Sequence, residues 1–147
     1  MIQYLSEGPI TPGQIAGEIA RLSNRTDTGG HSIFLGQVRD DISEGRRVRA
    51  IEYSAYEAMV KDEADKIKRV ILNEFNDILG IKIIHAVGIV GAGEISMFVL
   101  VSAGHRDHAT RACRRIVELI KERLPVWKKE IFEDNTHRWS QNTGISD

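Results

Sequence analysis

The first stretch of helical spacing lies near the amino terminus of the chain. A helix over residues 12–22 places three apolar side chains on one face, those of Ile15, Ile19 and Leu22. Thr11 stands directly before Pro12, and a hydroxyl residue followed by proline is typical of a helix start. We therefore predict a first helix over residues 12–22.

Two longer segments keep the same spacing. Residues 58–75 form the longest helical pattern, with a predicted buried stripe of Met59, Ala64, Ile67, Ile71 and Phe75. Residues 109–124 have apolar or small residues at helical spacing, namely Ala112, Cys113, Ile116, Leu119 and Ile120. Pro125 ends this third helix, because proline has no amide donor and restrains the residue before it.

Between the helices, the pattern changes to alternation and short apolar runs, which indicate strands. Residues 31–38 and 48–56 flank a charged turn at 40–47, so we expect them to pair as a hairpin. Residues 81–90 and 95–102 flank a Gly-Ala-Gly-Glu turn at 91–94, which predicts the clearest hairpin of the chain.

Residues 126–133 predict a last strand, and we expect the polar tail, residues 135–147, to be loop-like or to be ordered by a partner. No repeat, low-complexity segment or linker interrupts residues 1–147. The pattern predicts one α+β domain with antiparallel β hairpins and three main helices.

Composition and charge narrow the classes of function. The 147 residues carry a net charge of −1, so no general basic field exists for nucleic acid or an anionic membrane. No apolar run approaches the ~20 residues of a membrane helix, and residues 1–8 have no signal-peptide pattern. We expect a cytoplasmic protein that binds neither nucleic acid nor membrane.

One junction in the sequence suggests an anion site. Gly104, His105 and Arg106 stand between a predicted strand and a predicted helix, where backbone amides and the helix dipole favour negative charge. Arginine suits phosphate because its planar fork binds two oxygens together. Spacing alone leaves the alternative of a solvated basic loop open.

Two lysines flank the proline that ends the third helix. Lys121 belongs to the last turn, and Lys128 follows Pro125 by three residues. A lysine becomes a usable base or nucleophile when burial or a neighbouring cation lowers its pKa. The alternative is that both lysines only offset the helix dipole. Arg39, at the end of a predicted strand, matters only if it faces the same cleft.

Cysteine and histidine suggest no further reactive group. Cys113 is the only cysteine and falls on the apolar helix face, so we expect a buried, structural thiol. His105 and His108 have helical spacing, but no carboxylate pairs with them convincingly in the sequence. We therefore predict no metal site and no cofactor.

Several motifs together resemble the large, catalytic subunit family of molybdopterin synthase. They are Phe-Leu-Gly-Gln-Val-Arg at 34–39, His-Ala-Val-Gly at 85–88, Gly-Ala-Gly-Glu at 91–94, Ser-Ala-Gly-His-Arg at 102–106, Lys121, and Pro-Val-Trp-Lys-Lys-Glu at 125–130. The resemblance runs from about residue 31 to residue 139, and the order and spacing of these elements make it specific.

The resemblance implies an α/β hammerhead fold and a homodimer within a heterotetramer. A small ubiquitin-like subunit would bring sulfur as a carboxy-terminal Gly-Gly thiocarboxylate, and cyclic pyranopterin monophosphate would receive two sulfur atoms. By resemblance, Lys121 and Lys128 are the catalytic pair, with Lys121 nearest the thiocarboxylate carbon. Arg39, His105 and Arg106 would hold the pterin and its phosphate, with part of the site contributed across the dimer interface.

Two departures from that family concern substrate binding. Many members carry arginine where this chain has Ala86, and the tail has no clear counterpart of an arginine downstream of Arg138 and Trp139. Two other hypotheses stay open, a module that binds a ubiquitin-like protein without catalysis and a phosphate-ligand enzyme unrelated to pterins. The intact Lys121 and Lys128 favour catalysis.

Overall fold

The structure is a computed structural model that describes residues 3–22 and 24–141. Three helices are present in this part of the chain, α1 (Pro12–Ala20), α2 (Glu57–Glu74) and α3 (Arg106–Arg123). The strands are β1 (Leu5–Glu7), β2 (Gly30–Gln37), β3 (Ile42–Ser43), β4 (Arg46–Ala55), β5 (Ile78–Gly91), β6 (Ile95–Ala103), β7 (Val126–Phe132) and β8 (His137–Gln141). The expected α+β hammerhead class with three helices is confirmed.

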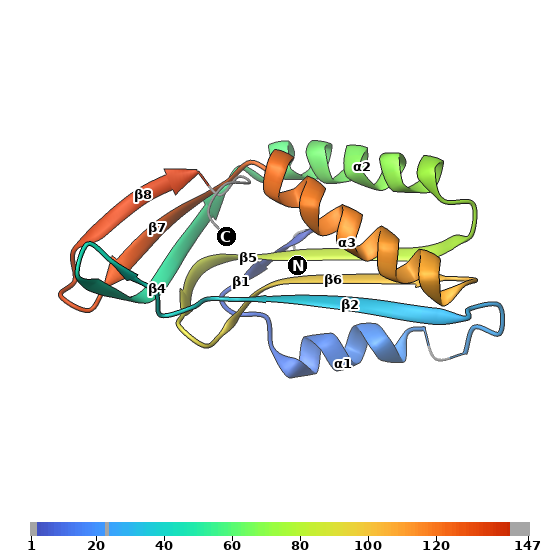
Figure 1. The fold of residues 1–147 in the computed structure, drawn as a ribbon, viewed down its shortest axis with the longest axis horizontal. Helices are drawn as coiled ribbons and strands as arrows, with labels where there is room; N and C mark the ends of the chain where they lie inside the picture. Colours follow the sequence, from blue (N-terminus) through green and yellow to red (C-terminus); the bar gives the residue numbers. More distant parts are fainter. Residues whose placement is uncertain (1–2, 23, 142–147) are drawn as a thin grey trace.

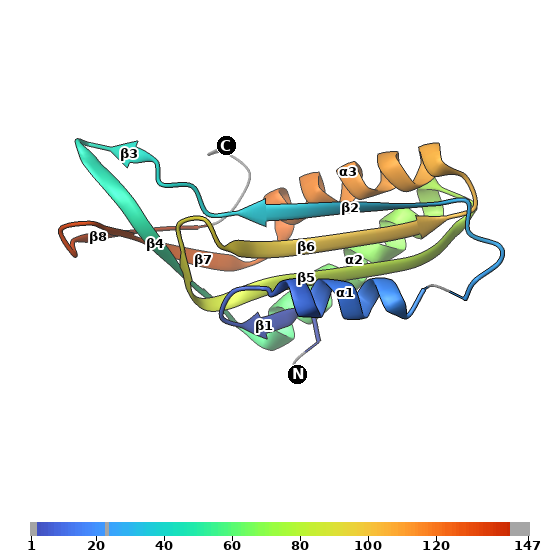
Figure 2. The ribbon, with the colours of Figure 1, turned by 90° about the horizontal axis from the view of Figure 1, so that it is seen from below.

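The strands join one sheet in the order β2-β6-β5-β4-β7-β8, with neighbours antiparallel. β1 adds to β5 in parallel, and β3 pairs with β4. Helices α2 and α3 cover one face of the long β2-β6-β5 part, and α1 lies on the other face (Figures 1 and 2). β4, β7 and β8 extend beyond the helices as an arm (Figure 1).

The first helix begins as its sequence predicts. The Thr11 hydroxyl oxygen accepts a hydrogen bond from the backbone amide of Gln14, and the side-chain oxygen of Gln14 accepts one from the backbone amide of Thr11. This reciprocal capping box satisfies two amides that the helix itself leaves unpaired. None of the described helices is long and apolar enough to cross a membrane.

The buried face of α2 differs from its prediction at Met59, and the last predicted member, Phe75, caps the helix and is only partly buried. Ala64, Ile67 and Ile71 are fully buried as expected, but Met59 is 54% exposed, and Val60 is buried in its place. Val60 lies four residues before Ala64 and so shares its face, whereas Met59 is rotated by about 100° from that stripe. The prediction for Met59 was wrong.

Of the two hairpins predicted from the sequence, one is present in the structure and the other is not. β5 and β6 pair as expected. The expected pairing of residues 31–38 with 48–56 was wrong, because β2 pairs with β6, while β4 lies between β5 and β7. β4 instead forms a tight hairpin with β3 through Glu44 and Gly45, whose positive φ angles of 54° and 75° match the twist of a two-residue turn.

The polar tail also corrects an expectation. Residues 137–141 were predicted to be loop-like or partner-ordered, but they form β8, which pairs along β7 from Ile131↔His137 to Trp127↔Gln141. Residues 142–147 lie outside the described part of the chain. The alternation of a strand gives this tail two faces, and one of them carries residues toward the cleft described next.

Candidate active site

Three of the five residues expected to form the site come together in one cleft. A cleft of about 840 Å³ is lined by Arg39, Lys121 and Lys128, among other residues. Lys121 comes from the last turn of α3, Lys128 from β7, and Arg39 from the segment directly after β2. Leu124 ends the helix before Pro125, and the chain turns into β7 at Val126, which brings the two lysines to the same wall.

The environment of Lys121 differs from that of an ordinary helix-end lysine. Partial burial lowers the pKa of Lys121 below its usual range, and the charges of Lys128 and then Arg39 lower it further. Desolvation and like charges both disfavour the ammonium form. The neutral amine, which can accept a proton or attack an electrophile, is therefore easier to reach at Lys121 than on an exposed lysine.

The pleat of β7 separates two adjacent lysines. Lys128 lines the cleft, whereas Lys129 forms an ion pair of 3.0 Å with Glu52 and lies 5.3 Å from the centre of the Trp139 ring. Successive side chains of a strand point to opposite faces, so only one of the pair can face the cleft. Lys129 therefore serves as a natural internal control for Lys128.

The arm contributes cleft residues that sequence reasoning missed. Arg138 on β8 lines the cleft, and its guanidinium donates a 2.7 Å hydrogen bond to Glu130 on β7, which also lines it. The wrong assignment of the tail as a loop concealed Arg138. The sequence carries little signal for this strand, because residues 137–141 contain one apolar residue, Trp139, and no alternation that would indicate a strand.

The inner wall of the cleft holds Tyr53 and His85, whose rings meet edge to face at 5.0 Å between centroids. His85 is only 2% exposed, and burial lowers its pKa, so the neutral ring is favoured. Its neighbour Ala86 is fully buried within the main hydrophobic cluster. Position 86 therefore belongs to the core of this chain and adds no charge to the cleft.

His105 and Arg106 lie at the other end of α3. A helix rises by about 1.5 Å per residue, so the 15 residues from Arg106 to Lys121 correspond to about 22 Å. Neither His105 nor Arg106 is among the residues that line the cleft. The five predicted residues thus form two groups within one copy of the chain, and their joint role stays a prediction.

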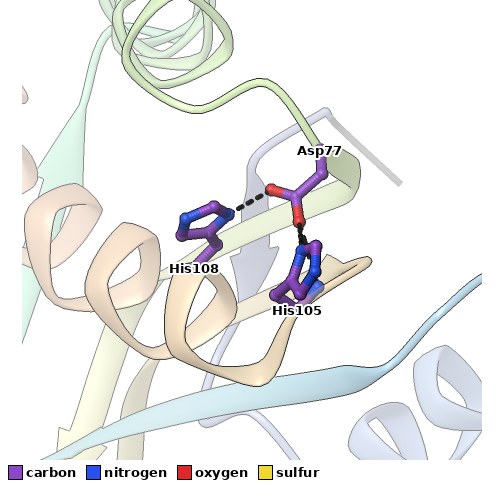
Figure 3. A group of neighbouring side chains, drawn as sticks. All are labelled: Asp77, His105 and His108. Carbon is purple, nitrogen blue, oxygen red and sulfur yellow. Dashed lines mark hydrogen bonds and ion pairs between the residues drawn. The ribbon is translucent and has the colours of Figure 1, made fainter.

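A carboxylate that sequence reasoning missed stands at this second group. Asp77, in the connection from α2 to β5, lies 2.7 Å from Nδ1 of His105 and 2.6 Å from Nδ1 of His108 (Figure 3). A carboxylate therefore does pair with both histidines, and the prediction that none would was wrong. Within residues 3–22 and 24–141, this is the one group of at least three side chains whose donor atoms, all within 4.8 Å, could hold a metal ion.

Cys113 has the environment that its place on the helix predicts. It is 2% exposed, and burial raises the pKa of its thiol above the usual range. Nucleophilic sulfur requires the thiolate and access to a reactant. The structural reading of Cys113 is therefore confirmed.

Comparison with known proteins identifies the family. The model of the MoaE protein family matches residues 6–123. A molybdopterin synthase catalytic subunit from Thermoplasma volcanium is 37% identical over 139 residues, covering 92% of this chain and 94% of that protein. The chain belongs to the MoaE family of molybdopterin synthase catalytic subunits.

Solved structures agree with the family. Molybdopterin synthase from Staphylococcus aureus matches with a TM-score of 0.82 and 28% identity over 95% of this chain and 97% of that one. A chain in the complex of subunits 1 and 2 of the molybdopterin-converting factor from Helicobacter pylori matches with a TM-score of 0.78, over 95% and 90% of the two chains. At 18% identity, the second match shows the fold alone. As a MoaE family member, the chain is the catalytic subunit of an enzyme of molybdopterin formation.

Proposed function

We propose that the chain is a sulfurtransferase that uses the Lys121 and Lys128 cleft. Sulfur moves from the carboxy-terminal thiocarboxylate of a small ubiquitin-like subunit to cyclic pyranopterin monophosphate, which gains the dithiolene of molybdopterin. The observation that carries this proposal is the convergence of Lys121, Lys128 and Arg39 on one cleft in a MoaE family member.

The chemistry of the cleft suits acyl and sulfur transfer without a metal. Release of sulfur from a thiocarboxylate needs proton transfer and stabilisation of the negative charge that develops on the acyl oxygen when the acyl carbon is attacked. Lys121, with its lowered pKa, is the group best placed to exchange a proton. Lys128 and Arg39 are the cations that stabilise the developing oxyanion.

The size and charge of the cleft suit the proposed reactants. A volume of about 840 Å³ is in the usual range of small-molecule sites, roughly 300–1,000 Å³. The cleft is lined by four cationic residues, Arg39, Lys121, Lys128 and Arg138, and by two carboxylates, Asp41 and Glu130, so it has an excess of positive charge in a chain whose net charge is −1. Such an excess attracts both an anionic thiocarboxylate tail and a phosphate.

The sulfur comes from a partner in this proposal. Cys113 is buried and keeps its proton, so it is a poor carrier. The Helicobacter pylori structure, described as a complex of subunits 1 and 2 of the molybdopterin-converting factor, supports a two-subunit assembly. We infer that a small subunit docks here and places its Gly-Gly tail in the cleft.

A homodimer accounts for the separation of the two groups. His105 and Arg106 are about 22 Å from Lys121 along α3, too far for one pterin to contact both groups within one copy. A second copy can bring its own His105 and Arg106 to the cleft. Two catalytic chains and two small subunits then form the proposed heterotetramer.

Reconstitution tests the proposed function. The purified chain is mixed with a thiocarboxylated small subunit and cyclic pyranopterin monophosphate, and the dithiolene product is assayed. Formation of molybdopterin is expected, with small-subunit carboxylate released. Tight binding of the small subunit without any product would contradict sulfur transfer and support a binding module instead.

A further inference from the structure

We propose that Asp77 is a positioning residue of the pterin-phosphate site, because it holds the imidazole of His105 in one orientation and one tautomer. The inference rests on the proposed function, in which His105 and Arg106 contact the phosphate. Asp77 itself would not touch the substrate. Its role is to hold the His105 ring by Nδ1, so that the edge with Nε2 is presented to a ligand beside Arg106.

Three hydrogen bonds converge on the Asp77 side chain. One carboxylate oxygen accepts from Nδ1 of His105 at 2.7 Å and from the His105 backbone amide at 3.0 Å. The other oxygen accepts from Nδ1 of His108 at 2.6 Å. The carboxylate is 19% exposed, whereas the His105 side chain is 78% exposed, so the carboxylate anchors a ring whose remainder faces solvent (Figure 3).

These bonds determine where the imidazole protons are. The hydrogen bond from His105, followed by that from His108, lowers the pKa of Asp77, so its carboxylate is ionised near neutral pH. An ionised carboxylate has no proton to donate, and both Nδ1 atoms must therefore carry protons. Nε2 of His105 is then the ring nitrogen left for a ligand; it donates to a phosphate oxygen only when the ring carries both protons, because in the ring with a proton on Nδ1 alone it is an acceptor.

The same carboxylate fills the anion position that the sequence predicted at the start of α3. The N-cap residue His105 makes no side-chain cap, and Asp77 caps its amide from another segment. The backbone amide of His105 is thus already bonded to the protein's own anion. A phosphate at this junction cannot use the His105 amide and must rely on the next amides of the helix and on side chains, which gives the orientation of the His105 ring more weight.

The Gly104 backbone lies directly against Asp77. Its amide donates a 3.0 Å hydrogen bond to the Asp77 carbonyl, and a Cβ atom at Gly104 would lie only 3.2 Å from a carboxylate oxygen of Asp77. Contact this close is tighter than most Cβ contacts, so a larger residue would push the carboxylate away. A glycine at position 104 therefore leaves room for the Asp77 carboxylate in its observed position.

A metal ion is the alternative ligand for Asp77, His105 and His108, and the surroundings disfavour it. The amino-terminal end of α3 carries partial positive charge, and Arg106 adds a full charge beside it. A bound cation would oppose both. It would also replace the hydrogen bonds that already satisfy the carboxylate, whereas a phosphate outside the ring would leave them intact.

Asp77→Asn tests the proposal because it keeps the shape of the side chain but not its two acceptors. An amide offers one oxygen and one NH₂ group, so one of the two rings must accept through Nδ1 and move its own proton to Nε2. Histidine ¹⁵N NMR of the parent protein is expected to show Nδ1 protonated in both rings. The variant is expected to show one ring in the other tautomer.

Kinetics of the reconstituted heterotetramer give the functional readout. We expect Asp77→Asn to raise KM for the pterin about tenfold or more, to change kcat less, and to leave small-subunit docking unchanged. Asp107→Asn, an exposed acid on the first turn of α3, is the matched control and should match the parent. In the background of His105→Ala, the Asp77→Asn effect on KM should disappear.

The outcomes separate this inference from the proposed function. If the parent protein forms no dithiolene, the proposed function fails. If the parent is active and Asp77→Asn keeps both the parent KM and the parent tautomers, the positioning role of Asp77 is wrong. Stoichiometric binding of Zn²⁺ that is lost in Asp77→Asn, together with activity that requires the ion, would replace the role with a metal site.

Discussion

Lys121 and Lys128 lie in one cleft although they come from different elements, and the charge of Lys128 is one of the causes that lower the pKa of Lys121. The relationship depends on the end of α3 at Leu124 and the start of β7 at Val126. Two cations in one partly buried cleft are costly for folding, which is typical of positions kept for function rather than for stability.

Removal of the Lys128 charge is expected to raise the pKa of Lys121. In Lys128→Met, one of the two like charges that disfavour the Lys121 ammonium is lost, while burial still lowers the pKa. NMR titration of the Lys121 side chain in both proteins measures the change. Lys129→Met, on the other face of β7, should leave the Lys121 titration where it is. A fall in the Lys121 pKa on removal of Lys128 would contradict the shared cleft.

Lys121→Met is expected to melt at a higher temperature than the parent near neutral pH. A pKa lowered on folding means that the unfolded chain binds the proton more tightly, so charged Lys121 destabilises the fold at pH values below its folded pKa. The difference between parent and variant should shrink as pH rises through the folded pKa toward the unfolded value of 10.5. Thermal unfolding at a series of pH values checks it, and a lower melting temperature at neutral pH would refute the sign.

Mixed dimers test whether two copies build one site. Lys121→Ala and Arg106→Ala are each expected to be inactive, but a mixed dimer would contain one cleft with Lys121 from one copy and Arg106 from the other. Random exchange of subunits makes half the dimers mixed, so about a quarter of the parent activity should return. Mass spectrometry confirms mixing. Mixed dimers without any activity would show that Lys121 and Arg106 do not act across an interface.

The buried face of α2 gives a stability prediction. Ile71→Ala is expected to lower the free energy of unfolding by about 2–5 kcal/mol, because it leaves a cavity in place of the fully buried isoleucine side chain. Met59→Ala is the matched control and should change it by roughly 0.5 kcal/mol or less, since Met59 is largely exposed. Denaturant unfolding measures both. A cost at Met59 equal to that at Ile71 would restore the stripe first predicted from the sequence.

Local features of the fold could be predicted from the sequence. The Thr11 cap, the end of the third helix before Pro125 and the β5–β6 hairpin all depend on residues close together in the chain. Pairing of β2 with β6 instead of β4 joins residues that are 58 positions apart at Gln37↔Ile95 and 73 apart at Gly30↔Ala103, and periodicity carries no information about such a partner. The charged turn after β2 looked like a hairpin loop, although its residues form the short β3–β4 turn.

The residues of the candidate site could likewise be predicted only in part from the sequence. Spacing alone left Lys121 and Lys128 open as helix-end charges; the resemblance to the family assigned them and Arg39 to one site, and the structure brings the three together in one cleft. Asp77 escaped notice because it comes from the α2–β5 connection and meets His105 only through the packing of α3 on the sheet. Arg138 escaped because the polar tail resembles a loop until its pairing with β7 is known. Partners distant in sequence were the ones that local reasoning could not supply.

The most direct test of the account is a single-turnover reconstitution with Lys121→Ala, with Lys129→Ala as the control. We expect Lys121→Ala to dock the thiocarboxylated small subunit normally but to form molybdopterin at least about 100-fold more slowly than the parent protein. Lys129→Ala should keep the parent rate. Formation of the dithiolene by Lys121→Ala at the parent rate would show that the site does not centre on this lysine.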